Sequence, residues 1–117
     1  TIEKEAISDL DKGFVSRFKS LVEERMKDAE LNVEDLGRNM GMSRVQLYRK
    51  LKSLTNYSPN ELLRQMRLKK AASLLASSDM TVAEIAYEVG FSSPSYFTKC
   101  YKEQFGESPT EFLKRRG

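Results

Sequence analysis

The chain of 117 residues contains no histidine, no tryptophan and a single cysteine, Cys100. Without histidine, neither a Ser/His/Asp triad nor a Cys/His pair can form, and the commonest general base is missing. One cysteine forms no internal disulfide, and without histidine the usual zinc clusters are excluded. The sequence therefore argues against an enzyme and predicts neither a cofactor nor a metal site.

Long hydrophobic runs are also missing. No apolar stretch approaches the roughly 20 residues of a membrane helix, and no hydrophobic signal region opens the chain. The composition, with 39% apolar and 32% charged residues, is typical of a soluble globular protein. We therefore expect a cytoplasmic segment that makes no membrane contact.

Strand patterns are almost absent, whereas apolar residues recur at helical spacing throughout the chain, so the sequence predicts an all-α fold. Cap residues divide it into about seven helices, each begun by Ser, Thr, Asn or a Ser-Pro pair except the first. The predicted helices cover about residues 9–28, 33–40, 44–54 and 59–77, followed by helices that begin after Thr81, at Pro94 and after Ser108.

An internal repeat organises these helices. Val33, Leu36 and Gly41 match Val82, Ile85 and Gly90 at a lag of 49 residues, and from Leu47 and Phe97 onward the lag is 50. Two copies of one helical unit are thus joined by a long linker helix. The predicted divisions are a linker from an absent upstream domain at 1–8, a first subdomain at 9–58, a connecting helix at 59–77 and a second subdomain at 78–117.

Each copy has a short helix, a turn with glycine and a longer helix begun by serine, which is the order of a helix-turn-helix motif. Gly41 and Gly90 follow the first helices, where glycine takes a positive φ without steric cost. Gly37 and Ala86 are small residues within those helices, which lets the second helix approach closely. The fold is predicted to contain two helix-turn-helix subdomains.

Charge is unevenly distributed along the chain. The segment from Arg38 to Lys70 holds nine Lys and Arg residues and one acid, Glu61, which gives a net charge of +8. Residues 1–31 carry −2 and residues 71–117 carry −1. A basic block inside a folded region favours a polyanion as partner, although a solvated helix face with its acids elsewhere in space explains it equally well.

The sequence resembles the AraC/XylS family of transcription regulators over roughly residues 10–116. The resemblance rests on the segments VEDLGRNMGMSRVQLYRKLKSLT, SPNELLRQMRLKKAASLL and TVAEIAYEVGFSSPSYFTKCYKEQFGESPTEFLK. The first two are similar to the C-terminal output domains of hybrid two-component sensor proteins. This resemblance implies double-stranded DNA as partner and a covalently linked upstream receiver or sensor domain, with RNA polymerase as a further candidate partner. Asn56 stands where the family often has Gly, and Asn tolerates the left-handed conformation.

In that family the second helix of each unit is the recognition helix, which implies candidate DNA-binding residues at its outward positions. Arginine can donate bidentate hydrogen bonds to guanine, and valine can contact a thymine methyl group. The second set is smaller and less charged, which favours readout by shape and short hydroxyl contacts. The first set is Arg44, Val45, Tyr48, Arg49 and Lys52, and the second is Ser93, Pro94, Ser95, Tyr96, Thr98, Lys99 and Lys102.

The sequence thus predicts sequence-specific binding of double-stranded DNA that regulates transcription. The connecting helix of 19 residues, Pro59 to Ser77, would be roughly 28 Å long, similar to the roughly 34 Å between successive major grooves on one side of DNA. The alternative is a helical protein-interaction module whose basic face docks an acidic partner. An enzyme is a second, remote alternative, since Cys100 has no visible activating base.

Overall fold

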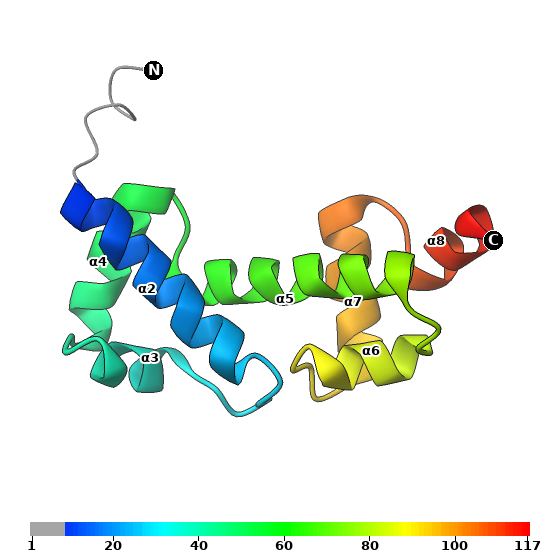
Figure 1. Cartoon of the computed structure of the whole chain (residues 1–117), viewed down its shortest axis with the longest axis horizontal. Helices are drawn as coiled ribbons and strands as arrows, with labels where there is room; N and C mark the ends of the chain where they lie inside the picture. The colour runs from blue at the N-terminus through cyan, green and yellow to red at the C-terminus, as the bar shows by residue number, and fades with distance from the viewer. Residues whose placement is uncertain (1–8) are drawn as a thin grey trace, which may run out of the picture. The chain divides into compact units, whose positions relative to one another are not determined.

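The computed structural model describes residues 9–117, and this part of the chain forms seven helices and no strand (Figure 1). The all-α prediction is therefore confirmed, while the predicted linker at residues 1–8 lies outside the described residues. The helices are α2 (Asp9–Arg25), α3 (Val33–Asn39), α4 (Arg44–Thr55), α5 (Pro59–Ser77), α6 (Val82–Glu88), α7 (Pro94–Phe105) and α8 (Pro109–Arg116).

The chain divides into two compact units. Among the described residues, the first unit contains 9–25 and 31–63, and the second contains 26–30 and 64–117. The division falls inside α5. The short segment 26–30, which lies between α2 and α3 in the sequence, belongs to the second unit rather than to the first.

In the first unit α2 packs against both α3 and α4. Phe18 and Val22 from α2, Leu36 from α3, and Leu47 and Leu51 from α4 are completely buried. Burying each of these side chains contributes about 1.5–3 kcal/mol. Because the two leucines lie four residues apart, they fix which side of α4 faces this core, and the opposite side is left to solvent.

In the second unit α7 packs against α6 and α8. The core contains Leu75, Ile85, Val89 and Phe97, each with no exposed surface. Cys100 lies in the same core and is 5% exposed, so it packs there as a small apolar residue.

The turns of the two motifs have the same hydrogen-bond pattern. The Met42 N–H donates to the carbonyl oxygen of Gly37 at 2.8 Å, and the Phe91 N–H donates to that of Ala86 at 2.9 Å. A Cβ atom on Gly37 would lie 2.8 Å from the carbonyl oxygen of Met42. A small residue is therefore required inside the first helix of the motif, as the sequence predicts.

Positive φ angles occur at matching places in the two units. Gly41 has φ 69° and Gly90 has φ 96°, which confirms the predicted turn conformation at both glycines. After the second helix of each motif, Asn56 has φ 66° and Gly106 has φ 81°. Asn56 thus takes the left-handed conformation that its position requires.

The predicted N-caps begin the helices as expected. The side chains of Asn32, Ser43, Thr81 and Ser108 each accept a hydrogen bond from the backbone N–H three residues later. The first helix, α2, ends at residue 25, three residues earlier than predicted. Its continuation is replaced by a turn in which the Glu30 N–H donates to the Asp28 carboxylate at 2.9 Å.

Candidate nucleic-acid interface

The outer side of α4 presents basic, aromatic and apolar side chains together. Val45 is 57% exposed and Tyr48 is 48% exposed, and Arg44, Arg49 and Lys52 are also exposed. All five candidate residues of the first unit are therefore exposed on α4, Arg44 because it is the first residue of the helix and the other four because they lie away from the buried leucines. A rigid helix holds them, so their relative positions do not depend on a loop.

The bases on this side of α4 are only weakly engaged within the protein. Arg44 lies 3.9 Å from the Glu34 carboxylate, and Lys52 lies 4.0 Å from that of Glu61, in pairs that are both well exposed. Exposed pairs of this kind are worth about 0–1 kcal/mol, so both bases can turn to another anion. Arg49 forms no hydrogen bond or ion pair with any described residue.

Lys50, by contrast, points toward α2. Its Nζ lies 4.7 Å from the centre of the Phe14 ring and 3.9 Å from the Asp11 carboxylate. Two neighbouring bases of one helix therefore face different surroundings, Arg49 solvent and Lys50 the side of another helix. Only the structure makes this distinction, because both residues belong to the same basic block of the sequence.

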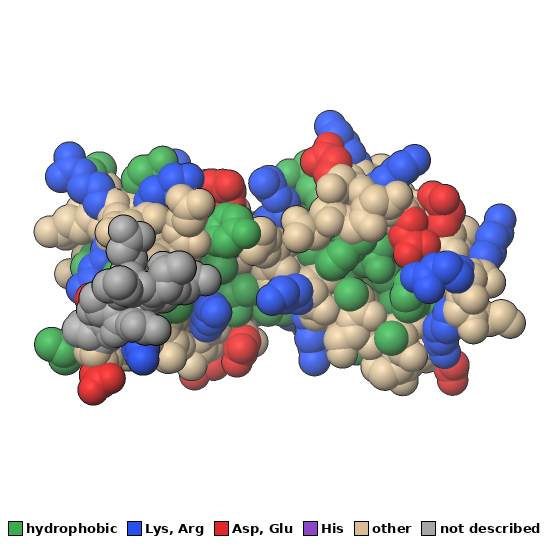
Figure 2. Space-filling view, turned by 90° about the horizontal axis from the view of Figure 1, so that it is seen from above, with side chains coloured by type: hydrophobic (Ala, Val, Ile, Leu, Met, Phe, Trp, Pro, Cys, Tyr) green, Lys and Arg blue, Asp and Glu red, His purple; other side chains and the backbone are tan. Residues whose placement is uncertain are grey.

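The corresponding side of α7 is less charged. Tyr96 is 50% exposed, and Ser95, Lys99 and Lys102 are exposed, whereas Pro94 and Thr98 are half-buried. Hydroxyl groups and one aromatic ring thus replace the arginines of α4. Figure 2 shows Lys and Arg side chains on the surface, with Asp and Glu side chains among them.

Ser93, a candidate DNA-binding residue, is also the N-cap of α7. Its hydroxyl oxygen accepts the Tyr96 backbone N–H at 3.3 Å and so caps α7, while Pro94 occupies the first turn. The Tyr96 ring lies 5.9 Å from the Phe91 ring, centre to centre. The turn of the second motif therefore supports the exposed tyrosine of its second helix.

Two arginines near the end of the chain make contacts that the sequence does not indicate. The Arg115 guanidinium donates to the Glu107 carboxylate at 2.7 Å, and this hydrogen bond raises the pKa of Arg115. The Arg116 guanidinium donates to the carbonyl oxygen of Leu75 at 2.6 Å. Both side chains thus bind groups of their own unit.

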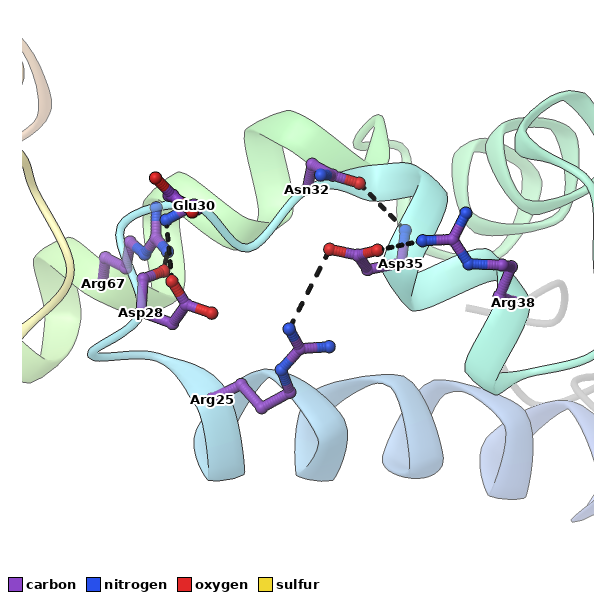
Figure 3. Close-up of polar contacts among 7 residues, drawn as sticks. All are labelled: Arg25, Asp28, Glu30, Asn32, Asp35, Arg38 and Arg67. Carbon is purple, nitrogen blue, oxygen red and sulfur yellow. Dashed lines mark hydrogen bonds and ion pairs between the residues drawn. The ribbon is translucent and has the colours of Figure 1, made fainter.

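Arg67, a member of the basic block, binds a backbone group of its own unit. It is half-buried, and its guanidinium donates to the Asp28 carbonyl oxygen at 2.8 Å (Figure 3). Desolvation lowers the pKa of Arg67, and the Asp28 charge opposes that change more weakly. One of the nine bases in the block is therefore half-buried and bound to the protein backbone.

No helix within residues 9–117 combines the length and the apolar character that a membrane crossing requires.

Two repeats of a short helix, a glycine turn and a longer helix with an exposed outer side define a double helix-turn-helix domain. A family model described as a helix-turn-helix domain matches residues 36–115. The chain belongs to this family, that of the AraC/XylS transcription regulators, as the sequence resemblance predicts.

Similar proteins include both regulators and parts of signalling proteins. Histidine kinase P4 of Formosa agariphila is 37% identical over 93% of the chain, which spans 8% of that protein. The Msm operon regulatory protein of Streptococcus mutans is 34% identical over 88% of the chain, which spans 37% of that protein. The chain thus corresponds to a small part of each of these curated relatives.

Two solved structures share the fold at comparable identity. The C-terminal domain of AraT, a response regulator from Geobacillus stearothermophilus, has a TM-score of 0.83 at 28% identity, covering 95% of this chain and 88% of that one. The DNA-binding domain of the transcriptional factor AdpA, solved in complex with a target DNA, has a TM-score of 0.80 at 30% identity, covering 86% of this chain and 89% of that one.

Proposed function

We propose that the chain binds double-stranded DNA sequence-specifically through α4 and α7 and thereby regulates transcription. The observation that carries the proposal is the outer side of α4, where Arg49 has no partner among the described residues and where Val45 and Tyr48 are exposed as well. The similarity to the DNA-binding domain of AdpA, solved with its target DNA, supports it. The 19 residues of α5 fit the expectation of two recognition helices in successive major grooves.

Each helix has a distinct role in this proposal. Arg44 and Arg49 donate to guanine edges, Val45 contacts a thymine methyl group, and Tyr48 and Lys52 bind a base edge or phosphate. On α7, the hydroxyls of Ser95 and Thr98 make short contacts while Lys99 and Lys102 bind phosphate. Ser93 and Pro94 begin α7 and bring its first turn to the groove, and Tyr96 lies beside them.

The chain is further proposed to be the output domain of a cytoplasmic signalling protein. Its similarity to histidine kinase P4 and to the C-terminal domain of the response regulator AraT supports a receiver or sensor domain upstream. RNA polymerase is a partner that such an output domain would contact if it activates transcription.

Selection of duplexes from a random pool tests the proposal, followed by mobility-shift titration of the selected motif. Arg49→Ala is expected to weaken binding and relax base choice at one position. Lys50→Ala is the matched control, because it removes an equal charge from the next residue, which faces α2. The proposal would be contradicted if no motif is enriched from the pool, or if the two substitutions weaken binding equally. Binding to an acidic protein instead of DNA would favour an interaction module.

A further inference from the structure

The two glycine turns have the same backbone conformation but different surroundings. A Cβ atom on Gly41 would meet nothing within 4 Å. A Cβ atom on Gly90 would lie 2.0 Å from the Met26 carbonyl oxygen and 2.8 Å from the Arg67 Nε. At the second motif the space beside the turn glycine is therefore filled by the Met26 carbonyl and Arg67, whereas at the first motif the space beside Gly41 is empty. An arginine of α2, Arg17, instead donates to the Asn39 carbonyl oxygen at 2.9 Å, just before the first turn.

Three contacts hold the segment 26–30 in place within the second unit. The Arg67 guanidinium donates to the Asp28 carbonyl oxygen at 2.8 Å (Figure 3). Lys27 forms an ion pair of 3.1 Å with Glu88, near the end of α6. Met26 is buried, and its carbonyl oxygen lies against Gly90.

Arg67 is not explained by a role at the DNA surface. Its Nε is buried without a hydrogen-bond partner, and its guanidinium already donates a hydrogen bond to a backbone carbonyl oxygen. Burying part of a guanidinium costs desolvation energy, so a residue that only had to fill this space would be apolar. What the arginine adds is a directed hydrogen bond that fixes the segment above the turn.

The turn at Gly90 leads directly to the second recognition helix. Phe91 follows Gly90 and packs against two residues of α7, with ring centres 5.2 Å from Phe97 and 5.9 Å from Tyr96. Phe97 is completely buried, while Tyr96 is exposed on the proposed DNA-binding side. A shift of the turn would therefore move the base of α7 and its exposed tyrosine together.

We infer that Arg67 and the segment 26–30 position α7 for base readout, which makes Arg67 a positioning residue of the second recognition helix rather than a DNA contact. The inference rests on the proposed function. It predicts that loss of the Arg67 hydrogen bond relaxes base choice only where α7 reads the DNA, and leaves the positions read by α4 unchanged.

The test repeats the duplex selection with Arg67→Met, which keeps most of the side-chain volume, and with Arg64→Met as a charge-matched control on the exposed part of α5. Tyr96→Ala and Arg49→Ala identify the positions read by α7 and α4. Arg67→Met is expected to lose preference at the Tyr96 positions and to bind the parent motif about tenfold more weakly. Arg67→Lys, which can still donate to the carbonyl, is expected to restore part of the preference.

An unchanged motif for Arg67→Met, or equal loss at the Arg49 positions, would overturn the inference. If Arg67→Met does not fold, Lys27→Glu and the charge-swapped variant Lys27→Glu/Glu88→Lys replace it. The single variant is expected to lose base preference at the Tyr96 positions, and the double variant is expected to recover it. A parent chain that selects no motif would refute the proposed function alone. Amide exchange at Phe91 and Tyr96 then decides the inference: faster exchange in Arg67→Met than in Arg64→Met supports it, and equal exchange overturns it.

Discussion

The two helix-turn-helix units repeat one backbone with different chemistry around it. In the first, no atom lies within 4 Å of where a Cβ on Gly41 would be, and α4 carries exposed arginines. In the second, the turn at Gly90 is covered by backbone and by Arg67, and α7 carries hydroxyls and lysines instead. The two units therefore share the backbone hydrogen bonds of the motif, but they differ in the charge of the second helix and in the residues packed against the turn glycine.

The largest expected difference concerns the glycine turns. Gly41→Ala should destabilise the protein by about 1 kcal/mol, because alanine is strained at positive φ. Gly90→Ala adds a collision with the Met26 carbonyl oxygen and should cost about 3 kcal/mol or more. Urea unfolding of both variants measures the difference. Equal losses would mean that the segment 26–30 moves away from the second turn freely.

The next largest difference is expected between substitutions on the two recognition helices, in how each one weakens DNA binding. Arg49→Ala is expected to cost about 1–3 kcal/mol on the selected motif and to relax one base position. Lys99→Ala should weaken binding similarly on all duplexes, because a lysine at that position binds phosphate. Titrations against the selected and a scrambled duplex separate the two effects. A sequence-dependent loss in Lys99→Ala would assign direct readout to that lysine.

The salt dependence of binding should divide unequally between the units. The slope of log affinity against log salt is about −0.9 per phosphate neutralised. Since α4 carries four bases and no acid, whereas α7 carries two bases and one acid, Arg49→Ala/Lys52→Ala should flatten the slope more than Lys99→Ala/Lys102→Ala. Affinities measured across a salt series give both slopes. Equal flattening would show that the second unit binds as many phosphates as the first.

The smallest expected effect is a response of the second unit to acid. The backbone N–H of Thr81 lowers the pKa of Glu84, and that of Ser108 lowers the pKa of Glu111. A lowered pKa stabilises the folded chain above the unfolded value and loses this contribution as the pH falls through the folded value. The capping box of α4 uses the neutral Gln46 and does not titrate, whereas Ser58 and Glu61 exchange the same two hydrogen bonds at the start of α5.

Melting temperatures between pH 7 and pH 3 test this difference. The double variant Glu84→Gln/Glu111→Gln should show a smaller fall in melting temperature than the parent below about pH 4. Because glutamine keeps the hydrogen-bond acceptor, the caps themselves remain. An identical fall in parent and variant would place the acid sensitivity in other carboxylates.

The sequence predicts the local structure closely. The helix α5 begins at Pro59 and ends at Ser77 as predicted, and Ser43 and Thr81 cap their helices as predicted. These features depend on residues within four positions of each other, where the backbone geometry is fixed by the helix itself. The exposure of Arg49 follows for the same reason, because the buried Leu47 and Leu51 determine the orientation of α4.

Contacts between distant residues were decided only by the tertiary structure. Arg67 and Asp28 are 39 positions apart, and Arg116 and Leu75 are 41 apart. No periodicity encodes such pairs, so the sequence shows neither the partner of Arg67 nor the difference in surroundings between the two turns. Packing brings the segment 26–30 against Gly90. At this turn glycine is therefore needed for two reasons, its positive φ angle and the close approach of the Met26 carbonyl oxygen.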